Sequence, residues 1–163
     1  MTPTLRQIFL CLPLVIATDL AAQTRDTPTP PAARCPAPAE LGASDLYGLW
    51  RLTLWTEGGS EQDPVSIGAL LLEPHPEYPG SVRGRLRRPG PGPDLEAQVA
   101  GDVTDEGEFN LDESADGVTM DAVWTGEPVD CGRAIRGQRR PAEGQSSDTP
   151  VLQFSLQRIS DRR

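Results

Sequence analysis

Beyond Ser44, apolar and polar residues alternate with a period of two, and turn residues interrupt the alternation at short intervals. Successive side chains of a β-strand point to opposite faces, so this period predicts half-buried strands. In the first segment Trp50, Leu52 and Leu54 share one face, while Arg51 and Thr53 share the other. The pattern predicts eight strands, at residues 47–56, 65–73, 81–88, 95–101, 109–111, 118–125, 131–139 and 151–158.

These strands predict an all-β fold. Short strands with hairpin-length links, each with one apolar face, favour an antiparallel eight-stranded up-and-down barrel, because closing the sheet removes its free edges. A two-sheet β-sandwich built from the same strands is the alternative. No segment has a convincing amphipathic helical period. The strand at 65–73 is apolar on both faces, which predicts either the most buried strand or one that touches a partner.

The N-terminal residues have the order of a secretory signal peptide. Arg6 precedes an apolar run over 8–17, and small residues follow as far as Ala22. The run is about ten residues long, whereas a membrane span needs ~20, so we expect no stable membrane span. Residues 1–22 are therefore predicted to be a signal peptide, cleaved after Ala22 or, alternatively, after Ala17.

The segment 23–43 is rich in proline and poor in large apolar residues, which predicts an extended linker before a barrel domain at 44–163. Cys11 would leave with the signal, so the mature chain keeps Cys35 and Cys131. In an exported chain these two most simply form a disulfide bond. An intermolecular bridge or free thiols are the alternatives. The expected localisation is periplasmic or secreted.

The composition of the chain limits the classes of partner that the protein could bind. The formal net charge is −9, and an acidic surface repels phosphate backbones, so we expect no nucleic-acid binding. All 15 basic residues are arginine. Together with the abundance of alanine, glycine and proline, this use of arginine in place of lysine indicates the codon usage of a GC-rich bacterial genome.

Gly48-Leu49-Trp50 opens the first predicted strand, seven further strands follow, and Arg158 lies late in the last one. This arrangement resembles the calycin superfamily, which includes lipocalins, avidins and bacterial metalloprotease inhibitors. The resemblance implies a lipocalin-like barrel in which Trp50 lies across one end and packs against Arg158. Such a contact between a cation and an aromatic ring would close the barrel floor.

Candidate binding residues lie on the polar face of the third strand. Arg83, Arg85 and Arg87 form a stripe that could hold a carboxylate or phosphate through forked hydrogen bonds. The alternative is the solvated side of a half-buried strand. Trp55 and Tyr78 could supply aromatic contact area for a sugar or a protein partner, or could pack under loops.

The sequence contains few residues that could bind a metal or a cofactor or form a nucleophilic triad, and we expect none of these sites. His75 is the single histidine, and no Gly-x-Ser-x-Gly motif accompanies it. One histidine and two paired cysteines are too few ligands for zinc. The segment 112–117 resembles half a calcium loop, but Val123 stands where a bidentate glutamate is needed, so we interpret it as an acidic hairpin turn.

We therefore expect an exported, non-enzymatic binding module that takes a small molecule or an exported protein. One alternative is an inhibitor of an exported protease that acts through the Pro-rich tail. Another is a hydrolase that uses Asp102, Asp112 and Asp121. The alternative interpretation of these residues is solvated surface charge. The barrel interior distinguishes two forms of the leading hypothesis: an open apolar cavity favours a small ligand, whereas a filled interior favours binding at the surface.

Overall fold

The computed structural model describes residues 34–90, 92–146 and 148–159. The predicted signal peptide, 1–22, and residues 23–33 of the predicted linker lie outside these ranges. The strands are β1 (Gly48–Thr56), β2 (Ser66–Pro74), β3 (Val82–Arg88), β4 (Leu95–Val103), β5 (Phe109–Ser114), β6 (Ala122–Val129), β7 (Ala134–Pro141) and β8 (Leu152–Arg158).

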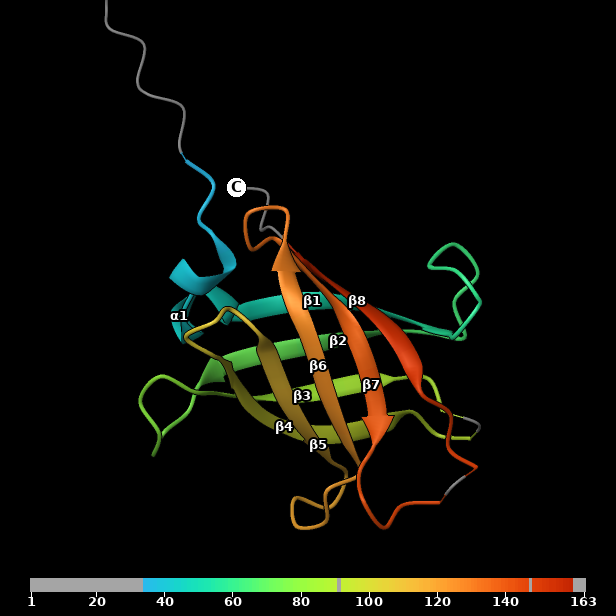
Figure 1. The fold of residues 1–163 in the computed structure, drawn as a ribbon. Coiled ribbons are helices and arrows are strands. Elements are labelled where there is room, and N and C mark those ends of the chain that lie inside the picture. The colour runs from blue at the N-terminus through green and yellow to red at the C-terminus, as the bar shows by residue number, and fades with distance from the viewer. Residues whose placement is uncertain (1–33, 91, 147, 160–163) are drawn as a thin grey trace, which may run out of the picture. The chain divides into compact units, whose positions relative to one another are not determined.

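The eight strands form one closed antiparallel barrel, in which each strand pairs with the next along the chain (Figure 1). β8 pairs back with β1, so that Arg158 lies opposite Trp50 and Leu152 opposite Thr56. The prediction of an up-and-down barrel is confirmed, and the sandwich alternative is wrong. The barrel has two ends. We call the one with Trp50 and Arg158 the closed end, and the opposite one, bordered by the β1–β2, β3–β4, β5–β6 and β7–β8 loops, the mouth.

Two strands begin three or four residues later than the sequence pattern predicts. β6 starts at Ala122 rather than at 118, because the Asp116 carboxylate accepts hydrogen bonds from the backbone amides of Val118 and Thr119 and holds them in a turn. Val118 is consequently 90% exposed. β7 starts at Ala134 rather than at 131, because the residues before it form a turn with positive φ angles.

Two short helical turns precede the barrel, η1 (Pro38–Glu40) and α1 (Ala43–Leu46). Pro38 suits the first helical position, and the Glu40 carboxylate accepts a 2.7 Å hydrogen bond from the Ala37 amide. η1 contacts β6, and α1 contacts β2. Leu41 and Ala43 are buried, so the described part of the predicted linker packs on the barrel. Within the described ranges, no helix has the length and apolar character needed to cross a membrane.

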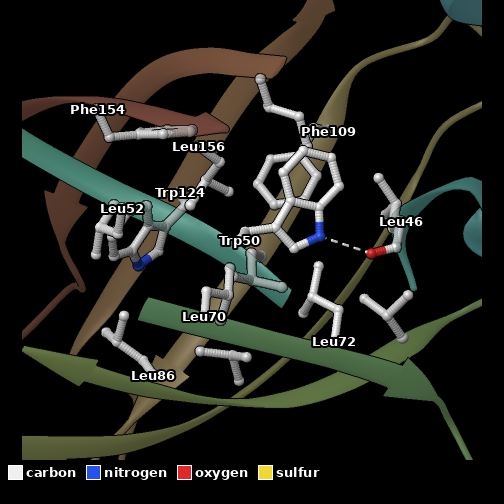
Figure 2. Close-up of a cluster of buried hydrophobic side chains, with 14 of the residues drawn as sticks. Leu46, Trp50, Leu52, Leu70, Leu72, Leu86, Phe109, Trp124, Phe154 and Leu156 are labelled. Atoms are coloured by element: carbon white, nitrogen blue, oxygen red, sulfur yellow. Dashed lines mark hydrogen bonds between the residues drawn. The ribbon is translucent and has the colours of Figure 1, made fainter. Parts of the chain in front are cut away.

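Large side chains fill the barrel interior (Figure 2). The Trp124 ring lies edge-on to Phe154, with 5.0 Å between their centroids, and Phe154 in turn lies 6.2 Å from Phe109. The apolar residues larger than alanine that are at most 1% exposed come from every strand except β4: Trp50, Leu52, Leu54, Leu70, Leu72, Val82, Leu86, Phe109, Leu111, Trp124, Ile135, Phe154 and Leu156. Because side chains fill the interior, the structure favours binding at the surface over binding of a small ligand in an open apolar cavity.

The closed end is held by the residues of the Gly-Leu-Trp motif. The Arg158 guanidinium lies over the Trp50 ring, 4.5 Å from its centroid, and donates a 2.6 Å hydrogen bond to the Tyr47 carbonyl. Trp50 Nε1 donates to the Leu46 carbonyl at 2.8 Å (Figure 2). Gly48 has a φ of +123°, which a side chain would strain, and this explains the glycine of the motif. The barrel is compatible with the calycin resemblance.

A disulfide bond joins Cys35 to Cys131, as predicted, across 96 residues of sequence with 4.9 Å between the Cα atoms. It ties the segment before η1 to the β6–β7 turn, where Asp130 and Cys131 adopt φ angles of +51° and +57°. Disulfides persist in oxidising compartments, so the bond is consistent with a periplasmic or extracellular location.

Candidate functional site

The arginine stripe of β3 lies in a groove on the outer face of the barrel. Val82 and Leu86 point inward and are buried, so Arg83, Arg85 and Arg87 point outward and are exposed. They line a groove of about 590 Å³, which we call the arginine groove, together with Glu73 of β2 and with Glu96 and Gln98 of β4.

The three arginines differ in how their charge is compensated. Arg87 pairs with Asp94 at 2.9 Å and with Glu96 at 3.6 Å. Arg83 and Arg85 have no carboxylate within 4.0 Å among the residues that the structure describes. Their guanidinium groups can therefore offer forked donors to a carboxylate from outside the chain.

An apolar strip borders this groove on β1 and β2. It consists of Leu49, Ile67 and Leu71, which are 43%, 43% and 40% exposed. The strand register places Leu49 opposite Leu71 and Leu71 opposite Arg85, so aliphatic and cationic side chains form one row across β1, β2 and β3. The two-faced apolar pattern of the second strand thus combines buried leucines on the inside with this exposed strip on the outside.

A second groove, of about 420 Å³, adjoins the first and shares Arg83 and Gln98 with it. Its rims come from the β2–β3 loop at His75 and from the β5–β6 loop at Val118 and Met120. His75 Nδ1 accepts hydrogen bonds from the amides of Glu77 and Tyr78, both at 3.2 Å, so this histidine orders its own loop.

The two predicted aromatic contacts do not line these grooves. Trp55 points outward from β1, lies opposite Gln153 of β8 and is partly exposed. Tyr78 is 61% exposed in the β2–β3 loop, where its ring lies 4.7 Å from that of His75. The structure brings Arg83, Arg85 and Arg87 together and leaves both aromatic residues outside the lining of either groove.

A buried charged cluster near the mouth escaped the sequence-based prediction. Glu113 and Arg139 are 2% and 5% exposed and form a bidentate ion pair. Arg139 Nε donates to Glu113 Oε2 at 2.7 Å, and Arg139 Nη2 donates to Glu113 Oε1 at 3.0 Å. Trp124 Nε1 donates to the same Oε2 at 2.9 Å. Glu113, Arg139 and the neighbouring Arg88 form what we call the mouth cluster.

Arg88 is the second cation of the mouth cluster. Burial lowers its pKa, the Glu113 charge opposes this, and the neighbouring Arg139 charge lowers it further. The alternation of inward and outward positions along each strand could have revealed the cluster. Arg88, Glu113 and Arg139 lie at inward positions, in the same series as Leu86, Leu111 and Ile135. A charge at an inward position of a closed barrel points into the core.

The acidic side chains between residues 102 and 121 have different surroundings. Asp102 lies on β4 opposite Asn110. Asp112 lines the second groove, and the Asp121 carboxylate accepts a 2.6 Å hydrogen bond from the Ala115 amide. Across residues 34–90, 92–146 and 148–159, no three His, Cys, Asp or Glu side chains gather so that they could hold a metal ion.

The carboxylate of Asp116, in the hairpin turn between β5 and β6, should make the stability of this turn depend on pH. Hydrogen bonds from Thr119, Val118 and Ser114 lower the pKa of Asp116 from 3.8 to about 2. Because the folded pKa is depressed, this carboxylate stabilises the hairpin fully above pH 3.8, and the contribution is lost as the pH falls through about 2. We expect a carboxyl-detected NMR titration to give Asp116 a pKa near 2. A midpoint close to 3.8 would show that these hydrogen bonds do not persist in solution.

No model of a known protein family matches the chain, and no curated protein is significantly similar to it.

Proposed function

We propose that this protein is an exported, non-enzymatic binding module that recognises an exported protein through its outer surface. The row formed by the apolar strip and the arginine groove carries this proposal. The chemistry of the row fits a segment that presents carboxylates beside aliphatic side chains: Arg83 and Arg85 would receive the carboxylates, and Leu49 and Leu71 would bury apolar area.

Two observations favour a surface partner over a small molecule in the barrel. The interior is filled with tryptophan, phenylalanine and leucine side chains, which leaves the usual ligand position of a small barrel occupied by the protein itself. The exposed Leu49 and Leu71 lie side by side on one face, and apolar groups rimmed by polar residues mark interaction sites.

The test starts with proteins captured from the exported fraction of the producing organism. A captured protein is purified, and its binding is measured by titration calorimetry against the wild type, R83E/R85E and L71D. We expect both variants to weaken binding by about tenfold or more, because they reverse the charge or break the apolar strip.

R133E/R140E is the matched control, since it makes the same charge change at two other exposed arginines. It should change the affinity by less than about threefold. Equal losses in R83E/R85E and R133E/R140E would mean that binding responds to net charge alone and would overturn the proposed surface. Unchanged affinity in R83E/R85E and L71D would do the same.

A further inference from the structure

We propose that the mouth cluster binds a small monovalent anion, a halide or a short carboxylate such as formate, which Arg88 and Ser66 hold at the mouth of the barrel. This site is separate from the outer surface proposed for the protein partner. The three observations that carry it are an uncompensated charge, two buried donor atoms without partners, and the packed core beneath them.

The first observation is the charge count. Glu113 is the one carboxylate of the mouth cluster, and its two oxygens already accept three hydrogen bonds from Arg139 and Trp124. Arg88 contributes a second guanidinium beside this pair, so the cluster holds two positive charges and one negative charge. Arg88 is half-buried, and a charge that is partly withdrawn from water is stabilised by a partner of opposite sign, which one monovalent anion would supply.

The second observation is a pair of orphaned donors on the inner side of the barrel. Arg88 Nε and Ser66 Oγ are both buried and have no hydrogen-bond partner within the described part of the chain. Ser66 pairs with the inward-facing Leu54, so its side chain also points inward near the mouth. A guanidinium N–H and a hydroxyl O–H are both donors, and an anion can accept from both.

The third observation limits the size of the ligand. Leu54, Leu86 and Trp124 fill the layer beneath the cluster and are at most 1% exposed. Gly68 lies across from Arg88, and a Cβ at that position would come within 2.8 Å of Arg88 Cβ, so the absent side chain leaves room for the arginine stem. A chain reaching into the barrel would displace this packed core, so the proposal is confined to a small ion.

Chloride and formate are the probes. The intact, disulfide-bonded protein is placed in sodium gluconate at constant ionic strength, and the ³⁵Cl NMR line width is followed as chloride replaces gluconate. We expect saturable broadening that formate competes away. Arg88→Leu should reduce the excess line width by about fivefold or more, and Ser66→Ala should reduce it by a smaller factor.

Arg140→Leu is the control, because it removes an exposed arginine of β7 and should leave the broadening unchanged.

The melting temperatures supply a second readout. In gluconate R88L should melt at or above the wild-type temperature, because it removes an unpaired charge, and chloride should raise the melting temperature of the wild type but not that of R88L. Near-UV circular dichroism of the tryptophans checks the fold, and Arg88→Gln replaces R88L if that variant is unfolded.

Absence of saturable broadening in the wild type would overturn the proposal. Equal broadening in the wild type and the Arg88 variant would overturn it as well, because the ion would then bind elsewhere. Either result would leave the partner surface on β1–β3 untouched, since that surface shares no residue with the mouth cluster.

Discussion

Replacing Glu113 by leucine is expected to lower the free energy of unfolding by about 3–5 kcal/mol, the usual cost of removing one partner from a buried ion pair. The loss is large because Arg139 is 5% exposed and would stay charged without its carboxylate, while Trp124 Nε1 would lose its acceptor. Urea unfolding followed by tryptophan fluorescence measures the change.

Two further variants show whether the cost comes from the unpaired charge. E113L/R139M removes both members of the pair and should lose less than half of what E113L loses, because it removes the buried Arg139 cation and leaves only the half-exposed Arg88. E96Q breaks the exposed pair with Arg87, where the two side chains are 72% and 66% exposed, and should cost less than about 1 kcal/mol. A double variant as unstable as the sum of its single changes would contradict this explanation.

Removal of the disulfide should have an effect of similar size. The bond closes a loop with a sequence separation of 96 residues, for which the entropy of the unfolded chain predicts a stabilisation of up to about 4.7 kcal/mol. We expect C35S/C131S to lose about 2–4 kcal/mol in urea unfolding. Hydrogen exchange should also rise in residues 34–46, because the covalent tie to the β6–β7 turn is gone.

The reduced wild type is the natural control for this experiment, and it should match C35S/C131S in both stability and exchange. A loss below about 1 kcal/mol would show that non-covalent packing holds the segment before β1. That packing includes Leu41 and Leu46, which are buried, and the turn at Gly107, where a Cβ would come within 2.7 Å of Pro38 and Ala39.

The sequence determined the strands, because a period of two in a closed sheet separates inside from outside wherever it persists. Trp50, Leu52 and Leu54 were placed correctly on one face, and Arg83, Arg85 and Arg87 on the other. The pattern was wrong at 118–121, because a side chain of the turn, Asp116, captured the amides that a longer β6 would have used.

The tertiary structure decided which polar residues meet. Leu49, Leu71 and Arg85 come from three strands, and only the register places them in one row. Arg88, Glu113 and Arg139 are also far apart along the chain. Each continues an inward series, but whether an inward charge finds a partner depends on the stagger of strands around the barrel. Local alternation fixes the face of a residue, whereas barrel closure fixes its neighbours, and the two candidate sites depend on the neighbours.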